Sequence, residues 1–360
     1  MRLFFKDDVC INQLVFFELL QAGLWEREVR LLAYEGIVFN EVFQLAQDQA
    51  VVGLVTAGLE RVSEKSIPKE IVLQCVGQTL QLEQRNLAMN HFISKLVERM
   101  TEVGLTPMLV KGQGIAQCYE KPLWRAHGDI DFLLDEENYL KAVDLLLPFS
   151  SGNKPEGQYS KHLGMSIDEW YVELHGTLRS GLSFQVDKEI DAVQDDTFTN
   201  NHFRTWKNGE IDVLLPSPDN DVFFVFTHFV KHFYKEGLGL KQLCDWCRLL
   251  WTYRDSLDIH LLESRVLKAG LMSEWKSFAA MAVDYLGMSA EAMPFYSVNK
   301  KWSRKADKIV AFVLKEGKWN KWRDTLIAGS IFPFSVLRFA PGILLNVNWL
   351  KIRERLFRHK

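Results

Sequence analysis

The sequence is poor in cysteine, and its N-terminal residues lack a continuous apolar segment. Its five cysteines are an odd number spread along 360 residues, at Cys10, Cys75, Cys118, Cys244 and Cys247. A disulfide framework needs paired cysteines, so we expect reduced thiols. Asp7 and Asp8 fall where a secretory signal would be apolar. Export is therefore not expected, and the sequence predicts a cytoplasmic protein.

An excess of charge of one sign is also missing, because the net charge is only −3. A protein with this balance has no global attraction for polyanions, so no specific nucleic-acid partner is predicted. Hydrophobic residues make up 48% of the chain, which is enough to bury a large core.

The sequence has no uninterrupted apolar run long enough to cross a bilayer. Residues 327–350 are mostly apolar and precede a basic end, but Pro333, Arg338 and Pro341 interrupt them. A spanning helix of about 20 residues tolerates few such interruptions. We expect this segment to pack on the protein, and peripheral membrane contact at the C-terminal end is the alternative.

Apolar periodicity divides the chain into three regions, predicted at residues 1–100, 101–216 and 217–360. The first is helical, and the last contains expected helices at 220–235, 239–253, 257–268, 272–286 and 303–316. The middle region predicts short strands at 105–110, 130–134 and 211–215 and a hairpin at 159–165 and 168–175. The expected fold is therefore α+β (mixed α/β), a small mixed sheet flanked by an N-terminal helical region and a C-terminal helical bundle.

Two aspartates, Asp129 and Asp131, lie two residues apart on a predicted strand. Both therefore project from one face, while Ile130 points into the core. Like charges this close would raise one pKa unless a divalent cation neutralises them, and carboxylate oxygens suit Mg²⁺ or Mn²⁺. The pair predicts a metal site.

A third carboxylate, Glu173, lies on a predicted neighbouring strand with His175 on the same face. Three acidic side chains suit two ions, one activating an attacking hydroxyl and the other holding a triphosphate. We expect Asp129, Asp131 and Glu173 to be the catalytic metal ligands, with a base acting on the acceptor as the alternative role of Glu173. His175 is expected to contact the nucleotide. Lys161 and His162 on the hairpin are further candidates for the same cleft.

A glycine-containing turn precedes the acidic pair. Gly112 and Gly114 flank Gln113 between a strand and a helix, where backbone amides can approach a phosphate. Lys111 is expected to meet phosphate charge directly. Arg125 lies in the loop before Asp129, where it is placed to contact phosphate or base.

Together these motifs resemble the uncharacterised nucleotidyltransferase family of the polymerase-β-type superfamily. The resemblance is carried by Leu109-Val-Lys-Gly-Gln-Gly114, Gly128-Asp-Ile-Asp131 and Val172-Glu-Leu-His175. It implies transfer of an NMP from an NTP with two Mg²⁺ ions and release of pyrophosphate. The wider superfamily usually has serine where this chain has Gln113. No pattern specifies the acceptor, which is a small molecule or a protein, the preferred base or an oligomeric state.

Two other functions remain open. The first is a catalytically inactive descendant that binds a nucleotide or a protein, which Gln113 favours. The second is a glycosyltransferase that uses Asp-x-Asp to hold a sugar nucleotide through a metal.

Two further motifs are interpreted as helix packing. His228 and His232 have the i, i+4 spacing of metal ligands, but Phe229 and Phe233 beside them indicate a core. Cys244 and Cys247 have the spacing of half a zinc site without a second pair, and Asp245 between them is expected to face the active site.

Overall fold

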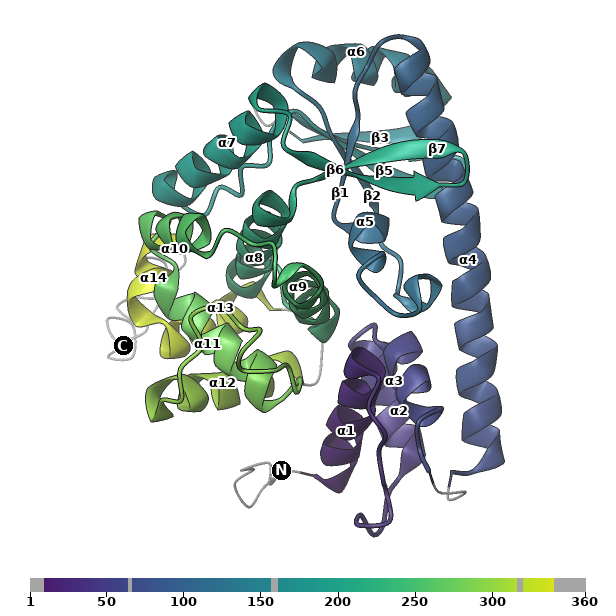
Figure 1. Ribbon diagram of the computed structural model, residues 1–360, viewed down its shortest axis with the longest axis vertical. Helices are drawn as coiled ribbons and strands as arrows, with labels where there is room; N and C mark the ends of the chain where they lie inside the picture. The colour runs from purple at the N-terminus through teal and green to yellow at the C-terminus, as the bar shows by residue number, and fades with distance from the viewer. Residues whose placement is uncertain (1–9, 64–66, 157–160, 316–319, 340–360) are drawn as a thin grey trace, which may run out of the picture.

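The computed structural model describes residues 10–63, 67–156, 161–315 and 320–339. A seven-stranded mixed sheet lies beside the long helix α4, and the helices from both ends of the chain gather below it (Figure 1). The helices are α1 (Ile11–Trp25), α2 (Phe39–Asp48), α3 (Val52–Leu59), α4 (Lys69–Glu102), α5 (Gly112–Ala116), α6 (Glu136–Leu146), α7 (Phe184–Thr199), α8 (Pro218–Lys235), α9 (Leu240–Tyr253), α10 (Ile259–Lys268), α11 (Met272–Asp284), α12 (Lys300–Val313), α13 (Lys321–Ile331) and α14 (Pro333–Phe339). The expected mixed α/β fold is confirmed.

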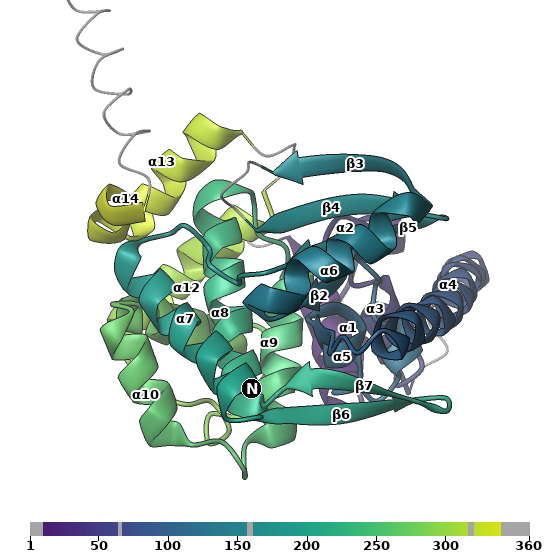
Figure 2. The same cartoon turned by 90° about the horizontal axis from the view of Figure 1, so that it is seen from above.

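The sheet has the strand order β3-β4-β5-β2-β1-β7-β6. Its strands are β1 (Met108–Val110), β2 (Ile130–Leu133), β3 (Ser150–Glu156), β4 (His162–Ile167), β5 (Trp170–His175), β6 (Phe203–Asn208) and β7 (Ile211–Pro216). Strand β2 runs parallel to β5 and antiparallel to β1, so the acidic strand lies near the centre of the sheet. Figure 2 shows the sheet from above, with α6 packed against it and α4 along one end.

The alternation predicted for β5 is confirmed. Val172 and Leu174 are fully buried, whereas Glu173 and His175, which alternate with them, are half-buried. In β2 the apolar side chains of Ile130 and Phe132 belong to the core beneath the sheet. The register places the functional face of both strands on the same side.

Strands β3 and β6 were not predicted, and both form edges of the sheet. The sequence of β3 contains Gly152 and Pro155, which weaken any strand signal. Strand β6 has no buried residue. Edge strands bury little apolar area, so alternating hydrophobicity does not reveal them.

The helices at the two ends of the described chain share one hydrophobic core. The side chain of Gln21 on α1 donates to the carbonyl of Tyr285 at 2.9 Å, and that of Gln49 donates to the carbonyl of Val313 at 3.0 Å. Helix α4 instead packs its Ile93 and Leu96 into the core beneath the sheet. The first three helices and the C-terminal helices thus pack as one layer, and the predicted limits at residues 100 and 216 stay predictions.

Helices α1 and α3 approach so closely that Gly58 has no room for a side chain. A Cβ atom there would lie 2.0 Å from the backbone oxygen of Leu19. We expect Gly58→Ala to destabilise the protein by about 1–3 kcal/mol, because one helix must shift. Gly77→Ala on α4 is the matched control, since nothing lies within 4 Å of its Cβ, and it should stabilise by about 1 kcal/mol. Chemical denaturation measures both, and equal stabilities would contradict the close packing.

No helix within the described ranges is long and apolar enough to cross a membrane. Val336 and Phe339 of α14 are buried in the shared helical core, in agreement with the packing expected for the start of this apolar segment. The basic C-terminal end, where membrane contact is the predicted alternative, lies outside the described residues.

Candidate functional site

The predicted carboxylates come together on two neighbouring strands. Asp131 on β2 and Glu173 on β5 are direct partners in the parallel register, and Asp129 immediately precedes β2. Asp131 is only 5% exposed, whereas Asp129 is exposed. Although Asp129 is exposed, the surrounding protein removes part of its hydration and so raises its pKa, and the negative charges of Asp131 and Glu173 raise it further. The three acids therefore act on one another electrostatically.

Two cationic or proton-donating groups hold Asp131. Lys111 Nζ lies 2.8 Å from its Oδ1, and His175 Nε2 lies 2.9 Å from the same oxygen. Burial alone would raise the pKa of Asp131, but these two groups keep it well below its ordinary value. The buried carboxylate is therefore ionised and compensated.

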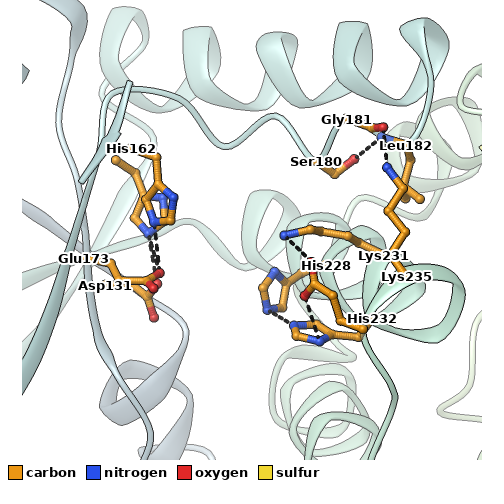
Figure 3. A network of polar contacts seen from close by, with 12 residues as sticks. Asp131, His162, Glu173, Ser180, Gly181, Leu182, His228, Lys231, His232 and Lys235 are labelled. Carbon is orange, nitrogen blue, oxygen red and sulfur yellow. Dashed lines mark hydrogen bonds and ion pairs between the residues drawn. The ribbon is translucent and has the colours of Figure 1, made fainter. Parts of the chain in front are cut away.

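Glu173 is held in a similar way by two imidazoles. His162 Nε2 lies 3.1 Å from Glu173 Oε2, and His175 Nε2 lies 3.5 Å from the same oxygen. Burial raises the pKa of Glu173, but the contacts with both histidines lower it more, to about 2. Figure 3 shows Asp131, Glu173 and His162 close together.

Lys111 has an unusual backbone conformation for a residue with a side chain. Its φ of 62° and ψ of −149° lie in a region that is essentially restricted to glycine. Such a conformation costs of order 1–3 kcal/mol, and it is maintained where the surrounding structure fixes it. The strain is located at the residue that contacts Asp131, which supports the expectation that Lys111 is functional.

The two residues after Gly112, Gln113 and Gly114, are buried. Gln113 is 3% exposed, and its Nε2 donates to the side-chain oxygens of Asn86 at 3.1 Å and Asn90 at 2.9 Å. A Cβ on Gly114 would lie 2.7 Å from a methyl group of Leu215, so α5 packs tightly on β7. Gln113 thus anchors the turn to α4, and nucleotide contact by Gly112, Gln113 and Gly114 stays a prediction.

Arg125 is buried in an ion pair instead of lying open to solvent. Its Nε and Nη2 each donate to a carboxylate oxygen of Asp245 at 2.7 Å, and the hydroxyl of Tyr119 donates to Asp245 at 2.7 Å. This network ties the loop before β2 to α9. Asp245 therefore faces the loop that carries the site, and nucleotide contact by Arg125 stays a prediction.

Lys241 on α9 lies beside the loop that leads to the acidic strand, and no sequence motif indicates this position. Its Nζ lies 3.3 Å from the carbonyl oxygen of His127 and 3.6 Å from where a Cβ of Gly128 would be. Burial lowers the pKa of Lys241 to about 8, and the positive charge of Arg125 contributes. No local pattern marks this lysine, because only the packing of α9 brings it to the acidic strand.

The second histidine pair lies on α8. His228 Nε2 and His232 Nε2 are 3.1 Å apart, and His232 Nδ1 is 3.2 Å from Glu236. Figure 3 draws this pair opposite Asp131 and Glu173. Burial lowers the pKa of His228 well below its ordinary value, and the charge of Lys111 lowers it further. Phe229 is fully buried, as the packing interpretation of α8 requires.

The cysteines behave as predicted. All five are free thiols, and all but Cys10 are buried. Cys244 and Cys247 are fully buried within α9, where burial raises the pKa of Cys244 well above its ordinary value. These two residues pack the helix and are not available as metal-binding thiolates.

A mixed sheet with an Asp-x-Asp pair at a central strand, and a third carboxylate in register on the parallel neighbour, defines a nucleotidyltransferase-like fold. A family model described as uncharacterised nucleotidyltransferase matches residues 36–287, and the chain belongs to this family. The resemblance expected from the motifs is confirmed.

Among solved structures, the chain is similar to an antigenic nucleotidyltransferase-like protein from Paracoccidioides brasiliensis. The identity is 13% and the TM-score is 0.32, and the match covers 56% of this chain and 92% of the other. The comparison with curated proteins gave no match. The family assignment therefore rests on the family model.

Proposed function

We propose that the protein transfers a nucleoside monophosphate from an NTP to an acceptor hydroxyl, phosphate or similar nucleophile, with release of pyrophosphate. The observation that carries this proposal is the register of β2 and β5, which sets Asp131 opposite Glu173. Membership in a nucleotidyltransferase family supports the reaction class. The acceptor is an unidentified small molecule or protein.

The carboxylates fit a divalent metal ion. Asp129, Asp131 and Glu173 offer hard oxygen ligands. The pKa of Asp129 is raised first by its partial loss of hydration and then by the charges of the other two carboxylates. A divalent cation relieves such repulsion, so these residues would hold Mg²⁺ or Mn²⁺, with two ions expected when an NTP is bound. Bound ions of this kind lower the pKa of an attacking hydroxyl and stabilise the phosphate charges.

Two lysines supply positive charge on either side of the acidic pair. Lys111 contacts Asp131. Lys241 extends from helix α9 and lies beside Gly128, the residue before Asp129. A triphosphate brought to Asp129 and Asp131 would add several negative charges there, and ammonium groups favour it. Lys111 and Lys241 are therefore the residues that we expect to position the phosphates, with His175 orienting Asp131.

The pH dependence of nucleotide binding tests the role of Lys241. Because its pKa is about 8, the side chain is mostly charged at neutral pH and neutral above pH 8. Affinity for an NTP with Mg²⁺ should therefore fall as the pH rises from about 7 to 9. Lys241→Gln should weaken binding about tenfold at pH 7 and flatten this profile.

Calorimetry at each pH measures this effect. Lys207→Gln is the control, since that lysine on β6 is 71% exposed and lies on an edge strand. It should reproduce the profile of the unmodified protein. A steep profile that persists in Lys241→Gln would assign the titrating group elsewhere.

Calorimetry with ATP, GTP, CTP and UTP, each with and without Mg²⁺, tests the proposed function itself. We expect heat of binding that depends on the metal for at least one NTP, followed by pyrophosphate release when an acceptor is supplied. A protein-binding descendant of the fold would give no metal-dependent nucleotide heat. Turnover of sugar nucleotides alone would favour the glycosyltransferase alternative.

A further inference from the structure

A cluster of three half-buried side chains lies on one face of β4 and β5. One ligand atom each from His162, Glu173 and His175 lies within 4.8 Å of the other two. The two histidines are direct partners in the antiparallel register, so both rings project from the same face. Their ring centroids are 4.4 Å apart with an interplanar angle of 15°. The backbone register itself thus brings the imidazoles together.

The nitrogen atoms of this cluster point at carboxylate oxygens. His162 Nε2 and His175 Nε2 lie 3.1 Å and 3.5 Å from the same oxygen of Glu173, and His175 Nε2 also lies 2.9 Å from Asp131. Nε2 of His175 is therefore shared between two carboxylates. Acidic oxygens and imidazole nitrogens thus converge at a point where positive charge is favoured.

The donor set differs from that of a magnesium site. Mg²⁺ prefers oxygen ligands, whereas imidazole nitrogen suits Zn²⁺ and the other later first-row divalent ions. Two imidazoles and one carboxylate with a position left for solvent or substrate are a common ligand set for zinc in catalytic sites. The side chains of His162 and Glu173 are each 19% exposed, so an ion has access from solvent.

We propose that His162, Glu173 and His175 bind one nitrogen-preferring divalent ion of the Zn²⁺ class, next to the oxygen site at Asp129 and Asp131. The inference rests on the proposed function in one respect, because Glu173 is a ligand both of the proposed catalytic ions and of the ion proposed here. It replaces one of the two expected Mg²⁺ or Mn²⁺ ions by a nitrogen-bound ion at Glu173, and it leaves an oxygen-bound ion at the aspartates.

The other histidine pair provides an internal control. Among the residues that the structure describes, His162, Glu173 and His175 are the one group of three potential ligands that meets at this spacing. His228 and His232 also have their Nε2 atoms 3.1 Å apart, and Glu236 lies beside His232, but within the described part of the chain these side chains do not form a group whose ligand atoms all lie within 4.8 Å of one another. A two-nitrogen site on one helix would bind more weakly than the proposed site.

Titration of the metal-free protein with Co²⁺, without nucleotide, tests the proposal. Co²⁺ stands in for Zn²⁺, and its visible absorption reports nitrogen coordination. We expect one equivalent to bind in the unmodified protein, in Asp129→Asn and in the double variant His228→Gln/His232→Gln. The double variant His162→Gln/His175→Gln should lose binding, and His162→Gln alone should weaken it about tenfold or more.

Circular dichroism and thermal unfolding check that each variant is folded. If His162→Gln/His175→Gln does not fold, His162→Gln alone decides the question, because β4 is farther from the central strands. Unchanged Co²⁺ affinity in His162→Gln would overturn the proposal. Loss of binding in His228→Gln/His232→Gln instead would place the ion on α8 and overturn it equally.

The same variants separate this inference from the proposed function. Metal binding is measured without NTP, whereas transfer is measured with Mg²⁺ and NTP. Transfer in a protein that binds no Co²⁺ would refute the nitrogen site and leave the proposed function standing. Co²⁺ binding through His162 and His175 in a protein that transfers no nucleotide would support the site and refute the proposed function.

Discussion

Replacing Asp129 with asparagine is expected to lower the rate of nucleotide transfer about a thousandfold or more, because the proposed catalytic ion would lose a charged ligand. The fold should be unaffected, since Asp129 is exposed and precedes the strand. Its raised pKa means that the ionised carboxylate is less favourable in the folded state than in the unfolded state. The neutral variant should therefore be as stable as the unmodified protein at neutral pH, or more stable.

The sign of this stability effect can be checked against pH. A carboxyl group whose pKa is raised by folding binds its proton more tightly in the folded state than in the unfolded state. Its contribution to stability is therefore present at low pH and is lost as the pH rises through the folded-state pKa. Asp129→Asn should remove this decline. The stability measurement thus distinguishes a catalytic loss from unfolding.

Asp131→Asn should abolish transfer as well, but with a loss of stability. Lys111 would remain half-buried without its carboxylate partner at 2.8 Å. Asp212→Asn on β7 is the control for both variants, since its side chain is 63% exposed. Labelled NTP transferred at the wild-type rate by Asp129→Asn would show that the acidic pair is not the metal site of the reaction.

Replacing Arg125 with methionine is expected to destabilise the folded protein by about 3–5 kcal/mol. The reason is that Asp245, which is 4% exposed, would lose both hydrogen bonds from the guanidinium and keep only that from Tyr119. A buried carboxylate without its cation is costly. Chemical denaturation gives the free energy of unfolding directly.

A surface pair with similar geometry is the matched control. Arg179 also makes two hydrogen bonds with one carboxylate, that of Asp191, but its side chain is 58% exposed. Arg179→Met should cost less than about 1 kcal/mol. The double variant Arg125→Met/Asp245→Leu should recover much of the lost stability, because no unpaired charge is left. Equal effects of Arg125→Met and Arg179→Met would contradict the role given to burial.

The acidic strand and its partner could be predicted because their signals are local. Two aspartates separated by Ile130 project from one face of any strand, and the alternation around Glu173 gives the same information for β5. That the two strands are neighbours was inferred from their pattern and is confirmed by the register. Short-range periodicity therefore accounts for the core of the candidate site.

Contacts between distant segments could not be predicted in the same way. Lys241 reaches the site because α9 packs beside the loop before β2, and Asp245 on the same helix binds Arg125. The inward direction of Gln113 depends on Asn86 and Asn90, which belong to a helix earlier in the chain. Tertiary packing determines these positions. The sequence suggests the direction of Asp245, but it indicates neither its partner Arg125 nor the position of Lys241.

The shared helical core has the same origin. Helix α1 shows almost no apolar stripe, because ten of its residues are buried by neighbours on several sides. A helix surrounded in this way needs partners from elsewhere in the chain, and here they include α3 and the segment after α11. Periodicity identifies the helix but not the elements that cover it.

The most direct test is the location of metal ions in crystals soaked with Mn²⁺ and a non-hydrolysable NTP analogue. Anomalous scattering identifies Mn²⁺ without reference to the protein model. We predict a peak bound by carboxylate oxygens of both Asp129 and Asp131, with the triphosphate beside it. A bound nucleotide with Mn²⁺ away from these two aspartates would contradict the account.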